Sequence, residues 1–553
     1  MRTQKIGDVT VFGTGSAGGK GAGLIRINEY ALPKTGRLTT WILSTSFYEH
    51  YLDRGRQLGD EERSLLAVIL QELGTVPVGV RSSATNEAAV AAGGLVSVRA
   101  GENVSYMLPN NHPDSAVRLQ QMEQAIACIY NDFIKKQRSD SPEQMAIVID
   151  PIIGVYDDTP AGPLYYPYIS GVANSYFPHA LKTQDPKEGY SRIAFGHGYA
   201  TVLDDFPVIS MATIRNPLPP TLLCTGPGQQ FFYALDMTKN SGLQGEELET
   251  MRRLHVRFAN FHKIKLLGLQ QSYITIEELV QHDHFGFKTG LTAIMEAIAA
   301  RLQSHFQIEF VFNIDFKSKS EESGLFHVVQ LTPLPAIEFG PVAIPEQPRR
   351  TYLSASHTQG HGVKRGVRFA LVVSPFTYSK DKHDIVRQGI SRMNRTLGER
   401  GEGYLILVPG RLGSKNRDWG INVEFTDVDK AVAIFEYGVD IAGRPQPLPE
   451  EASLTGGVYG SHFLYMVQGG YSEDQKRLQT RMYGTQGTHF LTNLVSNNII
   501  YSYLAPLEDL LDPWLFSIPD GEQAISLLSF PNPVSIYADS MQQRCVVVEE
   551  DAP

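Results

Sequence analysis

Residues 13–24 read Gly-Thr-Gly-Ser-Ala-Gly-Gly-Lys-Gly-Ala-Gly-Leu and place one lysine, Lys20, inside a glycine-dense loop. The apolar run Val9–Phe12 before the loop predicts a strand, and the pattern after it predicts a helix. Glycines let backbone N–H groups approach an anion closely, a helix N-terminus adds a favourable dipole, and lysine adds a positive charge. The loop therefore predicts a phosphate-binding site for a nucleotide.

Two common phosphate-binding patterns fail to describe this loop. The Walker pattern G-x-x-x-x-G-K-[ST] requires a glycine where Thr14 stands and a hydroxyl where Gly21 stands. The dinucleotide pattern G-x-G-x-x-G matches residues 13–18 formally, but residues 37–44 lack the acidic residue that should follow it. A flexible turn with a solvated lysine is the other interpretation of the loop.

Residues 78–85 read Val-Gly-Val-Arg-Ser-Ser-Ala-Thr, a strand pattern that runs into an arginine and a cluster of hydroxyls. Arginine offers a rigid, permanently charged fork for phosphate oxygens. The small residues of 88–94 leave room for a bulky anion. Arg81 is therefore a second candidate for phosphate binding, and the alternative is a strand end with a surface arginine.

Gly-Gly-Lys-Gly at 18–21 and Val-Arg-Ser-Ser-Ala-Thr at 80–85 together resemble the N-terminal ATP-binding domain of the phosphoenolpyruvate synthase and pyruvate phosphate dikinase family. The resemblance covers most of residues 10–335 and implies an ATP-grasp-like domain that uses ATP and Mg²⁺. Further stretches are similar to an uncharacterised bacterial branch of that family, at residues 106–110, 143–149, 170–175, 189–202, 308–310 and 328–333.

The resemblance also implies which residues bind the nucleotide. Lys20 and Arg81 would hold the ATP phosphates during catalysis, and the strand at 145–149 would lead into a hinge whose backbone receives adenine. Glu309 and Gln330 would hold Mg²⁺, which requires hard oxygen ligands; without the resemblance they are ordinary polar residues at strand edges. The implied cofactor-binding residues are Gly18, Gly19, Lys20, Arg81, Ser82, Ser83, Ile149, Ile152, Glu309 and Gln330.

Two positions depart from the family pattern. Gln307 stands where the family usually has a second acidic residue, so one carboxylate is missing from the implied metal cluster. Thr332 stands where the family usually has the arginine of Gln-x-Arg-Pro. Threonine cannot neutralise developing phosphoryl charge as arginine does, so ATP binding is expected to tolerate these changes better than catalysis.

Composition limits the class of protein. With 553 residues and 42% hydrophobic content, the chain has room for two or three globular domains. A formal net charge of −10 and a pI near 5.9 argue against a general surface for nucleic acid or anionic membranes. We find no export signal and no run near the ~20 apolar residues of a membrane span, so we expect a cytoplasmic protein. The cysteines are far apart and form no metal-spaced pair: Cys128, Cys224 and Cys545.

Spaced prolines at 335–350 predict a linker between two domains. The expected fold class is multidomain, α/β and α+β, with an ATP-grasp-like domain followed by a smaller β/α swivelling-type domain. Helical patterns occupy 115–136 and 290–306, and later strand patterns occupy 369–373, 404–408 and 431–437. The expected boundaries are 1–340 for the ATP-binding domain, 341–350 for the linker, 351–510 for the second domain and 511–553 for a C-terminal tail.

The second domain also resembles the bacterial branch, through residues 407–414 and 485–490. Its layout is similar to the phosphohistidine domain of the dikinases, with Gly-His-Gly at 360–362 opening the domain. By this resemblance His489 starts a helix and carries the phosphoryl group, and a helix N-terminus favours the anion that forms. His462, in a similar Gly-Ser-His-Phe, is the second choice. His489 could instead be a partly buried histidine that is hydrogen-bonded to a strand.

These observations predict an ATP-dependent phosphotransferase that cleaves ATP and passes phosphate through His489 to an unidentified small-molecule or protein acceptor. The residues after Pro506 are too few for the ~250-residue barrel that binds pyruvate in the full dikinases, so pyruvate is not assumed. Two alternatives are a nucleotide-binding protein without turnover and an ATP-grasp ligase that activates a carboxylate.

Overall fold

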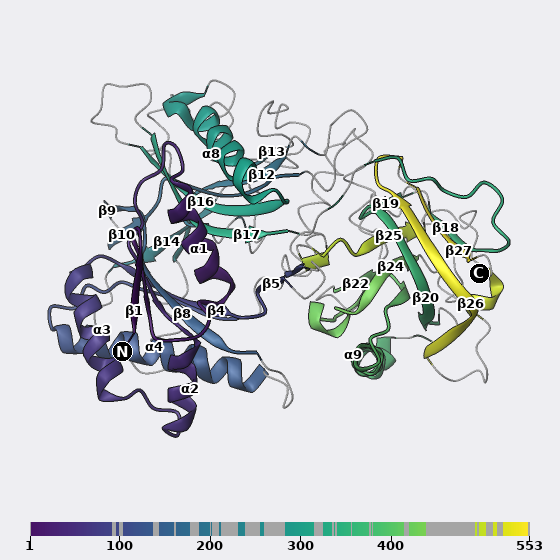
Figure 1. Cartoon of the computed structure of the whole chain (residues 1–553), viewed down its shortest axis with the longest axis horizontal. Coiled ribbons are helices and arrows are strands. Elements are labelled where there is room, and N and C mark those ends of the chain that lie inside the picture. Colours follow the sequence, from purple (N-terminus) through teal and green to yellow (C-terminus); the bar gives the residue numbers. More distant parts are fainter. Residues whose placement is uncertain are drawn as a thin grey trace.

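The protein is mixed α/β, with several sheets and few helices in the part that its computed structural model describes. Figure 1 shows an N-terminal lobe, coloured purple to teal, and a C-terminal lobe, coloured green to yellow. The described residues are 2–90, 96–98, 103–136, 143–159, 162–176, 187, 189–198, 201, 209–211, 231–237, 255–258, 283–314, 324–334, 337, 340–355, 357–374, 378, 380–413, 420–437, 493–494, 497–504, 512–516, 524–542 and 544–550.

The first sheet of the N-terminal lobe has the order β1-β2-β3-β8-β4-β7. Its strands are β1 Thr3–Ile6, β2 Val9–Phe12, β3 Thr40–Leu43, β4 Val78–Ala84, β7 Ser105–Leu108 and β8 Met145–Pro151. The predicted strand at 9–12 and the predicted helix at 115–136 are confirmed. One face packs against three helices, α2 Thr45–Asp53, α3 Asp60–Leu73 and α4 Ser115–Lys136. A short hairpin follows β4, formed by β5 Ala88–Val90 and β6 Val96–Val98.

The second sheet has the order β13-β12-β11-β16-β17. Its strands are β11 Ile169–Asn174, β12 Tyr190–Phe195, β13 Ile209–Met211, β16 Phe306–Ile314 and β17 Gly324–Pro333. It shares a hydrophobic core with helix α8, Phe287–Leu302, and with a four-stranded sheet. The strands of that sheet are β9 Val155–Thr159, β10 Gly162–Tyr166, β14 Phe231–Asp236 and β15 His255–Phe258.

The helix predicted at 290–306 is displaced at both ends. It begins at Phe287 and ends at Leu302, where Gln303 adopts a left-handed conformation with φ +53°. Phe306 instead opens β16, whose residues alternate between buried and partly exposed. A period of two is the pattern of a strand with one buried face, and it overrides the helical reading of the residues before it.

Helix α1, Gly18–Tyr30, connects the two sheets. Leu24 packs with Val9, Ile42 and Val148 of the first sheet, and Val329 of β17 packs against the same cluster. An added Cβ at Gly23 would lie 2.2 Å from the carbonyl oxygen of Leu331, so the backbones of α1 and β17 are in contact. The structure therefore places Lys20 in the first turn of α1 and not in the loop before it, and it fixes this helix against both sheets.

The C-terminal lobe contains one large sheet, of order β18-β27-β26-β20-β21-β24-β25-β19. The strands predicted at 369–373, 404–408 and 431–437 are confirmed within β20, β21 and β24. Helix α9, His383–Glu399, packs on one face and a second cluster covers the other. The strands are β18 Thr351–Ala355, β19 His357–Gln359, β20 Gly362–Val373, β21 Tyr404–Pro409, β24 Ala431–Tyr437, β25 Ile500–Leu504, β26 Ile525–Asp539 and β27 Arg544–Glu549.

Residues 525–549 belong to this sheet, where we expected a separate tail from residue 511. β26 pairs with β20 and β27, and β27 pairs with β18. β26 contains two prolines, Pro531 and Pro533. In the structure they lie opposite register shifts in β20, where a proline does not remove a ladder hydrogen bond.

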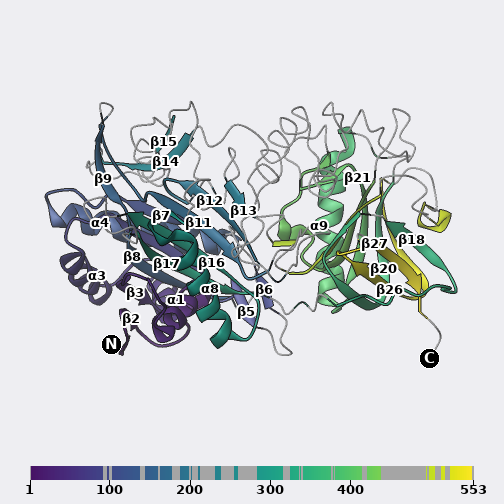
Figure 2. The ribbon, with the colours of Figure 1, turned by 90° about the horizontal axis from the view of Figure 1, so that it is seen from above.

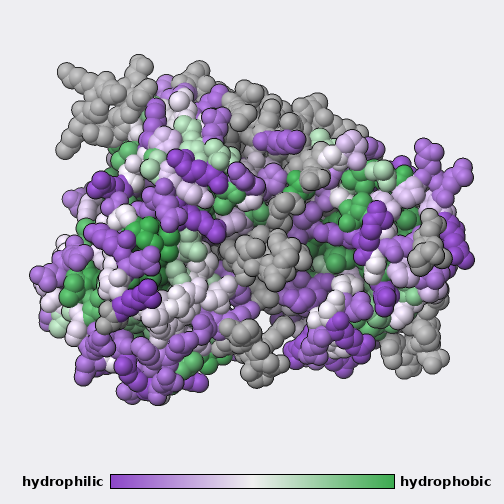
Figure 3. All heavy atoms as spheres, viewed as in Figure 1, coloured by the Kyte–Doolittle hydropathy of each residue, from purple (hydrophilic) through white to green (hydrophobic). Residues whose placement is uncertain are grey.

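The remaining described elements are short, and they lie between or beside the sheets. β22 and β23 form a two-stranded pair. Figure 2 shows the lobes side by side with β5 and β6 between them, and Figure 3 shows hydrophilic residues spread over the visible face of both lobes. No described helix is both long and apolar enough to cross a membrane. The short elements that lie between or beside the sheets are β22 Arg411–Leu412, β23 Gly420–Ile421, η4 His284–Gly286, η5 Lys380–Lys382, η6 Phe425–Asp427 and η7 Pro513–Phe516.

Gly23→Ala should destabilise the N-terminal lobe by about 1–3 kcal/mol, because the new methyl group would force α1 away from β17. Helix propensity alone would favour alanine by about 1 kcal/mol, so a loss of stability isolates the clash. Urea unfolding measures the change. Gly340→Ala is the control, since a Cβ there meets nothing within 4 Å. Equal or greater stability of Gly23→Ala would contradict the close contact.

Candidate functional site

The glycine loop before α1 is held by the hydroxyls of residues 44–46. Thr14 N–H donates to Ser46 Oγ at 3.1 Å, and Ser16 N–H donates to Thr45 Oγ1 at 3.0 Å. Gly13 and Gly15 have φ of +89° and +97°, which favours glycine at both positions. These N–H groups are therefore committed to the protein, and the first part of the loop is not an open phosphate cradle.

Helix α1 begins against β4. Gly18 has φ +70°, and an added Cβ would lie 1.9 Å from the carbonyl oxygen of Ser83. Gly21 N–H donates to Ser83 Oγ at 3.0 Å, and that hydroxyl donates to Ala17 O at 2.8 Å. Gly18 and Ser83 thus have a structural part in the site, because they fix the first turn of α1 and aim Lys20 along β4.

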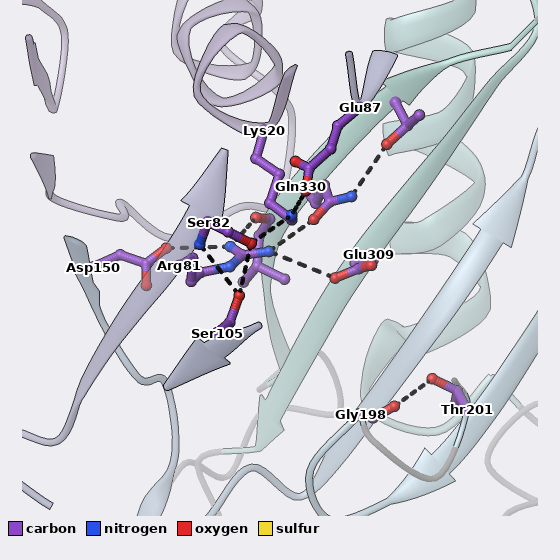
Figure 4. Close-up of polar contacts among 12 residues, drawn as sticks. Lys20, Arg81, Ser82, Glu87, Ser105, Asp150, Gly198, Thr201, Glu309 and Gln330 are labelled. Carbon is purple, nitrogen blue, oxygen red and sulfur yellow. Dashed lines mark hydrogen bonds and ion pairs between the residues drawn. The ribbon is translucent and has the colours of Figure 1, made fainter. Parts of the chain in front are cut away.

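Lys20 lies in an ion pair. Its Nζ is 2.7 Å from Glu87 Oε1 and 3.5 Å from Ser82 Oγ, and Asn103 Nδ2 donates to the same Glu87 oxygen at 3.2 Å. The side chains of Lys20 and Glu87 are 17% and 7% exposed. Figure 4 shows the two side chains pointing toward each other. The lysine predicted to meet a phosphate is therefore paired with an internal carboxylate.

Arg81 crosses from the first sheet to the second. From β4 its Nη1 donates to Val329 O of β17 at 2.8 Å, and its Nη2 donates to Gln330 Oε1 at 2.8 Å. Asp150 Oδ2 accepts from Nη1 at 3.3 Å, and Glu309 Oε2 lies 3.7 Å from Nη2. Figure 4 shows the guanidinium between these groups. The structure brings together Lys20, Arg81, Glu309 and Gln330 from widely separated parts of the sequence.

Opposing influences act on the charge of Arg81. Burial works against the guanidinium charge, but Asp150 and Glu309 outweigh it and raise the pKa of Arg81 above its usual value. Burial raises the pKa of Asp150, and Arg81 opposes that rise. A carboxylate this deep is stable because the guanidinium is hydrogen-bonded to it.

Glu309 and Gln330 are direct partners across β16 and β17, beside a register shift after Glu309. Both offer hard oxygen atoms at the same place, which suits a Mg²⁺ ion shared with phosphates. The guanidinium of Arg81 occupies that place here. Both positions that depart from the pattern of the resembled family have side-chain partners: Gln307 donates to Asn174 Oδ1 at 2.9 Å, and Gln330 donates to Thr332 Oγ1 at 3.2 Å.

The hinge residues do not reach Arg81. Ile149 packs in the hydrophobic core on the opposite face of β8. Ile152 uses its backbone groups internally: its N–H donates to Pro77 O at 2.8 Å, and its carbonyl accepts from Tyr165 Oη at 2.8 Å. The N–H and the carbonyl that Ile152 would offer to adenine are therefore each already hydrogen-bonded within the protein.

The predicted carrier histidines, His489 and His462, lie outside the described residues. The turn at 360–362 is described, and Gly360 and Gly362 have φ of +77° and +109°. Between them the buried ring of His361 bonds with Ser540 Oγ at 3.1 Å and with Gly340 O at 2.8 Å. This turn joins β19 to β20 in the sheet of the C-terminal lobe.

Sequence reasoning missed Glu87, Asn103, Asp150 and His197. Glu87 follows Arg81 by six residues, so its proximity to the hydroxyl cluster was a usable signal. Asp150 pairs across the sheet with Gly79, a relation that needs the strand register. Burial, reinforced by the positive charge of Arg81, lowers the pKa of His197 to about 3. His197 belongs to a turn whose Gly198 and Thr201 lie on the Glu309 side of the site in Figure 4.

No protein-family model matches the chain, and no curated protein matches it significantly. The interpretation of the site depends on its own geometry and chemistry.

Arg81→Lys should destabilise the N-terminal lobe by about 2 kcal/mol, because lysine keeps the charge but cannot bond to β8 and β17 through one planar fork. Urea unfolding tests this. Arg63→Lys is the control, because Arg63 is 50% exposed and its pair with Glu123 should contribute little. Equal losses of stability for the two substitutions would contradict the conclusion that Arg81 links the two sheets.

The free energy of unfolding should decrease as the pH is lowered, in part because of His197. Its pKa is about 3 in the folded protein and 6.5 as an ordinary value, so the unfolded chain binds a proton first. Stability is complete above pH 6.5 and decreases toward pH 3, by at most about 1.4 kcal/mol per pH unit. His197→Asn should therefore lose less stability between pH 7 and pH 5 in urea titrations. His112→Asn, in an exposed loop, should keep the wild-type slope, and an unchanged slope in His197→Asn would contradict the assignment.

Proposed function

We propose that the N-terminal lobe binds Mg·ATP between its two sheets and that the chain is an ATP-dependent phosphotransferase of the dikinase type. The observation that supports this most is the convergence of Lys20, Arg81, Glu309 and Gln330. Two cations beside two hard oxygen donors provide groups for phosphate and for Mg²⁺ in one place. Binding between two sheets also agrees with an ATP-grasp-like architecture.

Each residue has a defined role in this proposal. Lys20 and Arg81 bind the phosphates, which requires each to exchange a carboxylate partner for the ligand. Glu309 and Gln330 hold Mg²⁺, which supplies neutralisation of phosphate charge when bound. Arg81 also links the two sheets, so phosphate binding and the spacing of the sheets depend on the same side chain.

In the transfer step, a nitrogen of His489 forms a bond to the transferred phosphorus while the bond from that phosphorus to the leaving oxygen breaks. The phosphorus attacked is the β-phosphorus, so AMP leaves, the imidazole gives up its proton to solvent, and the histidine holds a diphosphoryl group. Water then displaces the terminal phosphate as inorganic phosphate, which leaves one phosphoryl group on the histidine. The phosphorylated histidine then passes its group to an acceptor that is a small molecule or a protein. The C-terminal lobe would present this histidine to the nucleotide site.

A second candidate function is nucleotide binding without turnover. Two residues favour this candidate, because Gln307 stands where the resembled family has a carboxylate and Thr332 stands where it has an arginine. Both side chains are hydrogen-bonded within the protein. Thr332 is buried and accepts a hydrogen bond from Gln330, and its hydroxyl, unlike an arginine, is uncharged. Such a site can hold ATP while lacking a group that stabilises transferred phosphoryl charge.

Mg²⁺ and ATP labelled in the β-phosphate should leave acid-labile label on the wild-type protein and release AMP. His489→Ala should lose the label, while His462→Ala, the matched control from a similar Gly-(Ser/Thr)-His-Phe sequence, should keep it. Scintillation counting and chromatography of nucleotides give both readouts.

Other outcomes separate the candidates. ATP binding by calorimetry with no AMP, no ADP and no label would reject phosphotransfer in favour of binding alone. Full nucleotide turnover in His489→Ala would instead indicate direct activation of an acceptor, as in an ATP-grasp ligase. Label retained by His489→Ala but lost by His462→Ala would move the carrier role to His462.

A further inference from the structure

The candidate site contains more negative than positive charge. Lys20 and Arg81 are its two cations, and Glu87, Asp150 and Glu309 are their carboxylate partners. The described side chains therefore sum to a charge of −1 where a polyanion is proposed to bind. An incoming phosphate meets no unpaired cation among these groups.

Glu87 is the carboxylate that engages Lys20. Its Oε1 accepts from both Lys20 and Asn103, at 2.7 and 3.2 Å. Its Oε2 is buried and has no hydrogen-bond partner in the described structure. Leaving a buried carboxylate oxygen without a partner is unfavourable, so this group is poorly optimised for stability alone.

Lys20 provides most of what compensates this buried charge. If a ligand removed Lys20, Glu87 would keep the Asn103 hydrogen bond and lose its ion pair. Breaking a buried pair in this way costs much more than separating an exposed one. A ligand must therefore bind strongly enough at other groups before it can recruit Lys20.

We propose that Glu87 is an internal competitor for Lys20 that makes the site selective for polyphosphates accompanied by a divalent cation. The binding energy of a small or metal-free anion cannot offset both the negative charge of the site and the loss of the ion pair between Glu87 and Lys20. This inference depends on the proposed nucleotide site and adds a specificity-determining residue to it. Glu87 acts through Lys20, so it is a positioning residue.

Glu87→Gln is the direct test, because it removes the charge while an amide oxygen can still accept from Lys20 and Asn103. Calorimetry with sodium tripolyphosphate in EDTA should show about tenfold tighter binding than in wild type. The gain for Mg·ATP should be smaller, because Mg²⁺ already neutralises part of the ligand charge. A merely structural role would alter thermal stability without this difference between ligands.

Glu62→Gln is a matched control in the same lobe. Glu62 is 5% exposed, pairs with Arg54 at 2.6 Å and also has a buried Oε2 without a partner. It lies on α3, away from the Lys20 site. It changes the net charge of the chain equally, so its tripolyphosphate affinity should remain at the wild-type value.

The outcomes distinguish this inference from the proposed function. If wild type binds Mg·ATP but Glu87→Gln gains nothing for tripolyphosphate, Glu87 is not a competitor and the nucleotide site stands. If neither protein binds either ligand, both proposals are overturned. Should Glu87→Gln fail to fold, an experimental structure of wild type with tripolyphosphate decides: Lys20 Nζ must leave Glu87, and a pair still within 4.0 Å would reject the inference.

Discussion

One guanidinium holds the two walls of the N-terminal lobe together. Arg81 projects from β4, the strand next to the edge of the first sheet, and bonds to the backbone and a side chain of β17 in the second. Helix α1 packs into the same space, with Gly23 against Leu331. The sheets, the helix and the candidate site therefore share a single spacing, and that spacing depends on a charge that would otherwise bind ligand.

This dual use of charge explains the character of the site. Each cation expected to hold phosphate is already compensated by a buried carboxylate, and the N–H groups at the start of the glycine loop are bonded to hydroxyls. Without a ligand, both cations of the site are thus already paired with carboxylates. Any ligand has to replace existing interactions, so its affinity reports a difference between two sets of contacts.

Local periodicity predicted much of the fold. The strands around residues 9–12 and 431–437 and the helix at 115–136 have patterns that tertiary packing did not override. β26 was not predicted as part of the sheet, and its pairing depends on register shifts in a neighbouring strand that accommodate its prolines. The charge pairs could not be predicted either. Lys20 and Arg81 were recognisable from the local sequence around them, whereas Glu87 and Asp150 acquire their roles only when the strands and the helix are placed in space.

β27 lies between β18 and β26, so the C-terminal lobe can complete its sheet only after the last strand of the chain's described part has been synthesised. Every described strand of the N-terminal lobe is complete by residue 333, whereas the sheet of the C-terminal lobe lacks interior strands until residue 549 has been translated. At about 5–20 residues per second, this leaves roughly 10–40 seconds between the two points. The nascent chain thus carries a finished first lobe beside an incomplete sheet, whose exposed strand edges are where a chaperone would be needed.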